Sequence, residues 1–166
     1  MLQRRSLFAL PVAALLGGCG FKLRGKQNYA FETIAVTPEK GAAVASELSR
    51  YLGDMVRPVA PPAGGVAPEV IVDILGETRE KVIVALNASG QVREYQLRIK
   101  VLFRMRTSQG RDLIEPTDIL QERDISFNES AVLAKEAEEV LLYRDMQSDI
   151  VQQLLRRIAA VKNLNP

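Results

Sequence analysis

The chain has 166 residues, a length that fits one domain with a buried core. Apolar residues make up 47% and charged residues 25% of it, which is typical of a globular domain and excludes a disordered chain or a polytopic membrane protein. With no histidine and one cysteine, it lacks the commonest metal ligand, the usual acid-base group at neutral pH and any internal disulfide. Its formal charge of +2 falls to zero without Arg4 and Arg5, which argues against bulk nucleic-acid binding.

The first 18 residues have the order of an export signal. The basic segment MLQRR is followed by the apolar segment SLFALPVAALL and then by Gly17 and Gly18. An apolar run this short, broken by Pro11, is no stable membrane span, because a spanning helix needs about 20 apolar residues. We therefore predict a signal peptide over residues 1–18 that is removed by cleavage.

The segment LGGC, which ends at Cys19, resembles the lipobox of bacterial lipoproteins. The resemblance implies cleavage before Cys19, a thioether from its sulfur to diacylglycerol, and an acyl chain on the new amino terminus. Several acyl chains attach a protein lastingly, since each buried CH₂ contributes about 0.8 kcal/mol. Gly20 and Phe21 replace the aspartate that commonly retains such proteins at the inner membrane, so the resemblance implies an outer-membrane location facing the periplasm. Residues 19–31 would form the acylated tether.

The body begins with a short strand and a helix. Thr33–Val36 is a β-branched run, and Thr37 and Pro38 suit the N-cap and the first position of a helix. From Glu39 to Met55, apolar residues recur at spacings of three and four and predict an amphipathic helix. The segment Arg57–Pro68 holds four prolines and two glycines and predicts a loop.

Strand patterns follow the loop. Val70–Leu75 and Val82–Leu86 are β-rich, and Gly76 between them indicates a bulge in one long strand. Asn87–Gln91, NASGQ, predicts a turn.

Arg93–Arg106 alternates between apolar and polar residues, except for Leu102 on the polar face, which predicts a strand with one core face and one cationic face. The segment TSQGRD then predicts a hairpin into a fourth strand over Leu113–Phe127, in which Pro116 weakens the early pairing.

The C-terminal segment predicts a long helix. Its apolar stripe comprises Leu142, Met146, Ile150, Leu154, Ile158 and Val161. The resulting β-α-β-β-β-α order predicts one α+β domain over residues 32–162, with two helices packed on one face of a roughly four-stranded, mostly antiparallel sheet. Residues 163–166 are a short tail, and the second sheet face is expected to stay uncovered.

The chain shows no catalytic motif and no phosphate-binding loop, so we expect no enzyme, no metal and no cofactor beyond the lipid chains on Cys19. Charge is segregated instead: the segment Arg93–Arg106 is basic and the segment Asp112–Glu139 is acidic. Two interpretations stay open. The neighbouring strands pair across the sheet, or the basic side chains of Arg98, Lys100, Arg104 and Arg106 meet an anionic ligand such as phosphorylated lipopolysaccharide.

Three segments resemble the LptE family of lipopolysaccharide-assembly lipoproteins. GCGFKLRG at residues 18–25 resembles its mature start, C-G-aromatic-x-L-R. SGQVREYQL at 89–97 resembles its N-G-Q-x-x-E-Y-Q turn and strand. VLAKEAEEVLLYRDMQSDIVQQLLRRI at 132–158 resembles its A-L-A-K segment and terminal helix. The order of the three segments along the chain is more specific than any one of them.

This resemblance implies an outer-membrane lipoprotein that plugs and supports the β-barrel of the lipopolysaccharide translocon, an LptD-like partner. It also implies binding of lipopolysaccharide and help in its insertion into the outer leaflet. Lys135 matches the lysine of A-L-A-K, whereas Ala88 and Ser89 carry no charge where the family has its other ligand-binding basic residue. The candidate ligand-binding residues are therefore Lys135, Arg93, Arg98 and Lys100, and the candidate partner-contacting turn residues are Asn87, Ser89 and Gly90.

Two rival functions stay open. The first is a periplasmic scaffold lipoprotein of another envelope transport or barrel-assembly machine, which would differ in the partner it binds. The second is a lipid-anchored hydrolase using an acid pair such as Asp112 and Glu115, for which a buried, strongly perturbed carboxylate in a cleft would be the first sign.

Overall fold

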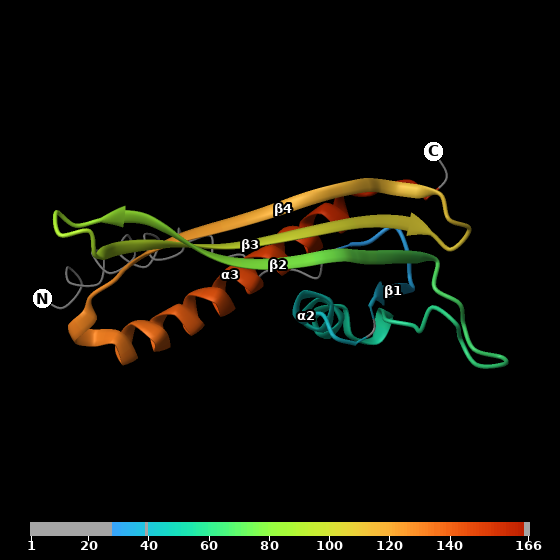
Figure 1. The fold of residues 1–166 in the computed structure, drawn as a ribbon. Coiled ribbons are helices and arrows are strands. Elements are labelled where there is room, and N and C mark those ends of the chain that lie inside the picture. Colours follow the sequence, from blue (N-terminus) through green and yellow to red (C-terminus); the bar gives the residue numbers. More distant parts are fainter. Residues whose placement is uncertain (1–27, 39, 165–166) are drawn as a thin grey trace, which may run out of the picture.

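The chain folds as a four-stranded sheet with two helices on one face (Figure 1). The computed structural model describes residues 28–38 and 40–164. The elements are β1 (Ile34–Thr37), α2 (Ala43–Leu52), η2 (Gly53–Met55), β2 (Val70–Leu86), β3 (Val92–Thr107), β4 (Asp112–Ser126), η3 (Glu129–Ala131) and α3 (Val132–Ala160). The strand order is β1-β2-β3-β4, with β1 parallel to β2 and the other pairs antiparallel, so the predicted fold class is confirmed. The predicted signal peptide and the tether up to residue 27 lie outside the described residues.

The start of α2 differs from the sequence prediction. The prediction that the helix begins at Thr37 and Pro38 is wrong, because α2 begins at Ala43. Thr37 is instead the last residue of β1, and its hydroxyl donates a hydrogen bond to Asp73 Oδ1 at 2.7 Å. The backbone N–H of Val44 donates to Glu77 Oε2 at 3.1 Å. A carboxylate from β2 therefore caps the helix in place of a local side chain.

Three long strands make up most of the sheet. The pairing of β2 with β3 shifts in register between Ile74 and Gly76, which confirms the predicted bulge at Gly76. The pairing of β3 with β4 also shifts in register, between Phe103 and Met105, opposite the segment that contains Pro116. The predicted alternation of β3 is confirmed, since its helix-facing side chains are fully buried: Leu97, Ile99, Val101, Phe103 and Met105.

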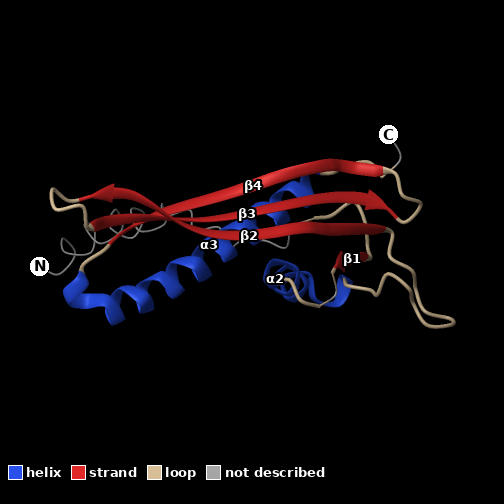
Figure 2. Cartoon of the chain, viewed as in Figure 1, coloured by secondary structure: helices blue, strands red, loops and turns tan. Residues whose placement is uncertain are grey.

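Both helices lie on the same side of the sheet (Figure 2). α3 crosses beneath β3 and β4, and α2 lies beside α3 and packs against β1 and β2. The apolar stripe predicted on the C-terminal helix is buried at Met146, Ile150, Leu154 and Ile158. No helix of the described residues covers the opposite sheet face.

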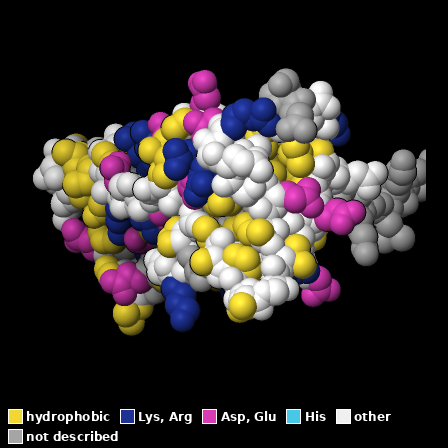
Figure 3. All heavy atoms as spheres, turned by 90° about the vertical axis from the view of Figure 1, so that its right-hand side faces the viewer, with side chains coloured by type: hydrophobic (Ala, Val, Ile, Leu, Met, Phe, Trp, Pro, Cys, Tyr) yellow, Lys and Arg dark blue, Asp and Glu magenta, His cyan; other side chains and the backbone are white. Residues whose placement is uncertain are grey.

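The molecule has two unlike ends. The hairpin end comprises the turn Asn87–Gln91 and the first turns of α3, whereas the β1 end comprises β1, α2, the first part of β2 and the loop at 57–69. Figure 3 looks onto the β1 end, where apolar side chains gather across the middle of the surface. Among the described residues, no helix is long and apolar enough to cross a membrane.

Candidate functional site

The predicted turn at the hairpin end is formed and closely hydrogen-bonded. Oδ1 of Asn87 accepts hydrogen bonds from the backbone N–H groups of Ser89 and Gln91, both at 2.9 Å. Gly90 has a φ of 79°, in the left-handed region that favours glycine. One side chain and one glycine thus hold the tip in a defined shape. The role of Asn87, Ser89 and Gly90 in partner contact stays a prediction.

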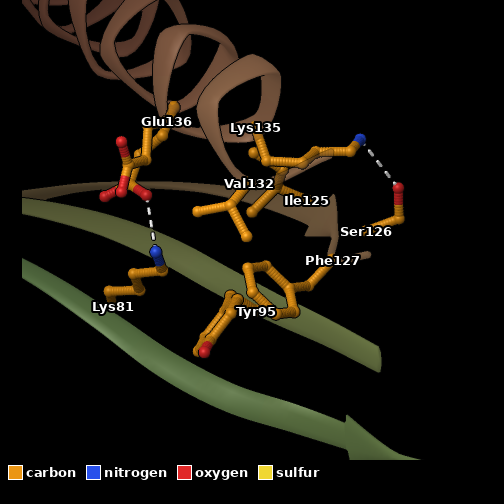
Figure 4. A pocket seen from close by; sticks show the side chains of 9 residues that line it. Lys81, Tyr95, Ile125, Ser126, Phe127, Val132, Lys135 and Glu136 are labelled. Carbon is orange, nitrogen blue, oxygen red and sulfur yellow. Dashed lines mark hydrogen bonds and ion pairs between the residues drawn. The ribbon is translucent and has the colours of Figure 1, made fainter. Parts of the chain in front are cut away.

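A pocket of about 180 Å³ opens at the hairpin end, between the last residues of β4 and the first turns of α3 (Figure 4). Its apolar part includes the rings of Tyr95 and Phe127, which meet edge to face with 5.4 Å between their centroids. Lys81 of β2 and Lys135 of α3 line it from two sides. The remaining lining residues are Ile125, Ser126, Val132, Glu136 and Glu139.

Each lysine of this pocket has a carboxylate partner. Lys135 Nζ lies 2.8 Å from Glu138 Oε2 and donates to a serine hydroxyl of β4 at 3.0 Å. Lys81 Nζ lies 2.6 Å from Glu139 Oε2 and 4.3 Å from the centroid of the Tyr95 ring. Ion pairs that are partly open to solvent contribute only about 0–1 kcal/mol, so an incoming anion can compete for either ammonium group.

Lys81 is a residue that the sequence analysis does not identify. It lies in the segment Gly76–Lys81, which the hydrophobic pattern treats as a spacer between two β-rich runs. In the structure β2 continues through this segment, and its register pairs Lys81 with the helix-facing Leu97. The sequence feature that could have identified Lys81 is its position: it is a charged residue at a place in the alternation of β2 where the side chain faces the helices.

The other predicted ligand-binding residues are not all brought together. Arg93 is exposed at the start of β3, and its carbonyl accepts a hydrogen bond at 2.8 Å from the backbone N–H of a residue that lines the pocket. Arg98 and Lys100 lie on the sheet face away from the helices, where they pair with Glu122 at 2.9 Å and Asp118 at 3.0 Å. For Arg98 and Lys100, the geometry agrees with the first interpretation of the segregated charges, in which neighbouring strands pair across the sheet. Their role in ligand binding stays a prediction.

Arg104 and Arg106, on the same face, converge on Asp73 of β2. Their Nε atoms lie 2.8 and 2.7 Å from Asp73 Oδ2, and the Thr37 hydroxyl binds the other carboxylate oxygen. Burial of this carboxyl acts to raise its pKa, but hydrogen bonds from Arg106, Thr37 and Arg104 outweigh burial and lower the pKa to about 2. Because both oxygens are engaged by sheet neighbours, this perturbed carboxylate belongs to an ion-pair cluster of the sheet.

The remaining candidates contribute no further site. Asp112 and Glu115 are exposed on the first half of β4. Across residues 28–38 and 40–164, no group of three or more cysteine or acidic side chains is placed to hold a metal ion. Cys19 lies outside the described residues, so its acylation stays a prediction.

Solved structures of bacterial lipoproteins resemble this fold. The solution NMR structure of lipoprotein B from Nitrosomonas europaea superimposes with a TM-score of 0.67 at 36% identity, over 85% of this chain and 91% of that chain. Rare lipoprotein B from Shewanella oneidensis (TM-score 0.61, 20% identity, 77% and 92% covered) shows the fold alone. The same holds for a minor lipoprotein from Acinetobacter baumannii (TM-score 0.61, 22% identity, 80% and 94% covered).

A comparison with curated proteins gives no match. The family described as lipopolysaccharide-assembly, LptE, matches residues 31–158, which include every strand of the fold, α2 and all but the last two residues of α3. The match confirms the resemblance drawn from the three sequence segments. The chain therefore belongs to the LptE family of lipopolysaccharide-assembly lipoproteins.

Proposed function

We propose that this chain is an outer-membrane lipoprotein that plugs and supports the β-barrel of the lipopolysaccharide translocon. It binds lipopolysaccharide and aids its insertion into the outer leaflet, and it has no catalytic role. Acyl chains on Cys19 hold it on the periplasmic face of the outer membrane, and its partner is an LptD-like barrel. Membership of the lipopolysaccharide-assembly family supports this proposal.

The observation that carries the ligand half is the placement of Lys81 and Lys135 beside an aromatic pocket at the hairpin end. Lipopolysaccharide joins phosphate groups to an acylated, apolar unit. Ammonium groups bind phosphate oxygens through charge-assisted hydrogen bonds, and the rings of Tyr95 and Phe127 offer apolar surface next to them. The pocket therefore matches both parts of this ligand.

The partner half is supported by exposed apolar side chains around the turn. Ile83, Val84 and Leu86 of β2 are 52%, 47% and 57% exposed at the hairpin end. A group of large apolar side chains left in solvent marks an interaction surface. Because the turn at Asn87–Gln91 is already held by its own hydrogen bonds, its insertion into a barrel needs little further ordering.

The ligand half is tested by reversing the pocket charge. We expect Lys81→Glu combined with Lys135→Glu to weaken binding of purified lipopolysaccharide to the full chain by about tenfold or more, since two charge-assisted contacts are lost. Lys40→Glu with Lys162→Glu makes the same charge change on exposed lysines outside the pocket and is the matched control. Equal binding by the two double variants would remove the ligand half.

The partner half is tested by native extraction of outer membranes. We expect the full chain to co-purify with an outer-membrane barrel, and a photo-crosslinker at Ser89 to join the two proteins. Purification as a monomer would contradict the plug. Co-purification with a different envelope machine would establish the rival scaffold function instead. Cys19→Ala should release the chain from the membrane fraction if the acyl chains are its anchor.

A further inference from the structure

The side of α3 that packs against α2 continues toward the start of α3, beyond this contact. On α3, Val151 and Leu155 are buried on one side, and Ser148 on that side donates to Glu47 of α2 at 2.8 Å. Residues three, four and seven apart share one side of a helix. The same side therefore continues toward the start of α3 through Arg144, Leu141, Val140, Ala137 and Leu133.

We call Leu133, Ala137, Val140 and Leu141 the α3 strip. None of the residues that the structure describes covers the α3 strip: Leu133 is 82%, Val140 68% and Leu141 59% exposed. A surface helix normally directs its apolar residues to the core and its polar residues outward. The α3 strip is a second apolar side on the same helix, and a contiguous apolar surface of this kind marks a binding site.

A hollow lies where the α3 strip meets α2. Its volume is about 410 Å³, and it is lined by Glu47, Arg50, Tyr51, Arg144, Gln147 and Ser148. Arg50 comes from α2 and Arg144 from α3, so each helix contributes one arginine to the lining of the hollow. Tyr51 adds an exposed ring at the rim.

These two arginines have no hydrogen-bond or ion-pair partner among the residues that the structure describes. Glu47, the acidic residue of the hollow, is buried, and its two carboxylate oxygens accept hydrogen bonds from Gln147 and Ser148. It is therefore engaged within the seam. Arg50 and Arg144 are both exposed and form no ion pair with it. Paired guanidinium groups are the preferred protein ligands of phosphate.

We propose that the α3 strip and the arginine hollow together bind one lipopolysaccharide molecule, with a phosphate of its lipid A between Arg50 and Arg144 and an acyl chain along the α3 strip. This inference rests on the proposed function and adds a second contact for the same ligand.

The dimensions of the site fit this ligand. From Leu133 to Arg144 the helix rises about 16 Å, close to the depth of about 15 Å that the acyl chains fill in one leaflet of a bilayer. The charges also set a direction. Arg50 and Arg144 favour phosphate at the end of the α3 strip that adjoins α2.

The site is separate from the lysine pocket. Lys135 and Arg144 lie nine positions apart on one helix, which places them about 14 Å apart along the axis and on opposite sides of it. Lys135 faces β4, while Arg144 faces the hollow beside α2. A lipid leaving one site can therefore be received at the other without displacing the same side chains.

The first test locates the lipid. We expect a photo-crosslinking residue at Val140, placed in the full chain and expressed in a Gram-negative envelope, to form an adduct with lipopolysaccharide. The same residue at Gln109, an exposed turn position at the β1 end, should form none. An adduct at Val140 with a protein alone would overturn the proposal, since the α3 strip would then be a protein interface.

The second test removes the phosphate contact. We expect Arg50→Glu with Arg144→Glu to reduce the Val140 adduct by about tenfold, because two charge-assisted contacts become repulsive. Lys40→Glu with Arg156→Glu makes the same charge change on exposed residues outside the hollow and should leave the adduct unchanged. Arg50→Lys with Arg144→Lys keeps the charge and should give an intermediate yield, since lysine lacks the bidentate geometry.

Binding of purified ligands separates this proposal from the proposed function. Lipopolysaccharide stripped of its phosphates should bind wild type and the arginine double variant equally weakly, and phosphatidylglycerol vesicles should not compete with intact lipopolysaccharide. Full binding by the arginine variant, alongside loss of binding by the Lys81/Lys135 variant, would overturn this inference and leave the proposed function standing. Preference for phosphatidylglycerol would overturn the choice of ligand.

Discussion

The strand β2 runs through both ends of the molecule and shows how differently they are built. Its first five residues, Val70–Ile74, are buried beside β1, whereas none of the residues from Leu75 to Leu86 is buried. At the β1 end the sheet faces α2 and α3, but at the hairpin end it faces α3 alone. The contrast indicates that burial at the β1 end supplies most of the free energy of folding. The hairpin end contributes little to stability and depends on the β1 end to stay folded.

The charged groups follow the same division. Asp73 near the β1 end is 7% exposed and is held by Arg104 and Arg106. At the hairpin end, the ion pairs of Lys81 and Lys135 remain partly open to solvent. Asp73, the shared carboxylate of the cluster, is buried although its arginines are partly exposed, and a buried carboxylate resists exchange with outside ligands more than partly solvated pairs do. We therefore expect stability effects to concentrate at one end and binding effects at the other.

The largest expected effect comes from the core of the β1 end. Phe103 is fully buried, and Phe103→Ala should lower the free energy of unfolding by about 3–5 kcal/mol through lost burial and a cavity. Ile83→Ala, a half-exposed position at the hairpin end, should cost less than about 1 kcal/mol. Urea unfolding followed by circular dichroism measures both. Similar losses at the two positions would contradict the division between the ends.

The next effect comes from the ion-pair cluster. Asp73→Asn leaves Arg104 and Arg106 without their shared carboxylate and should destabilise the fold by about 2 kcal/mol at neutral pH. Asp118→Asn removes an exposed partner of Lys100 and should cost less than about 1 kcal/mol. Comparing the two variants by denaturant unfolding shows whether burial, and not the presence of an ion pair, decides the effect.

The same carboxyl predicts a pH dependence. The pKa of Asp73 is about 2 in the folded chain against an unperturbed 3.8, so the unfolded chain takes up its proton first as pH falls. Its contribution is complete above about pH 4 and is lost between about pH 4 and pH 2. The stability curve of wild type should therefore fall more steeply in this window than that of Asp73→Asn. Parallel curves would show that this carboxyl is not linked to folding.

The fold was predictable because its strands carry local signals. The alternation along Arg93–Arg106 predicts which face of β3 is buried, and Gly76 predicts the bulge in β2. The start of α2 was not predictable by the same means. The helix is capped by Glu77, which accepts a hydrogen bond from the backbone N–H of Val44, 33 positions earlier in the chain. A local sequence pattern cannot indicate a partner that distant.

The candidate site was predictable only in part for the same reason. Lys135 was found through a family resemblance, and Arg93 lies near it at the hairpin end. Lys81 joins Lys135 only because the β2 register places it on the helix-facing side. Arg98 and Lys100 lie on the expected face, but their partners belong to β4 and depend on strand pairing. The sequence shows which side chains are charged, but only the fold shows which of these charges are paired with an opposite charge.

A smaller effect is expected from the two hairpin turns. Gly90 and Gly110 have φ values of 79° and 91°, so alanine at either position should cost about 1 kcal/mol of backbone strain. Gly76→Ala is the control, because an added Cβ there meets nothing within 4 Å and φ is not positive. Hydrogen exchange should show Gly110→Ala weakening the whole sheet. Gly90→Ala should weaken only the amides near its own turn, if the hairpin end opens separately.

The smallest expected effect concerns the α3 strip. Leu133→Gln and Val140→Gln replace exposed apolar side chains with a good helix former, so each should change the free energy of unfolding by less than about 0.5 kcal/mol. The same variants should sharply reduce the lipopolysaccharide adduct formed by a photo-crosslinker at Leu141. A side chain that contributes nothing to folding but is required for a contact belongs to a binding surface. Loss of more than about 1 kcal/mol would instead mean that the α3 strip packs within the folded chain, and the hairpin end would then be part of the core.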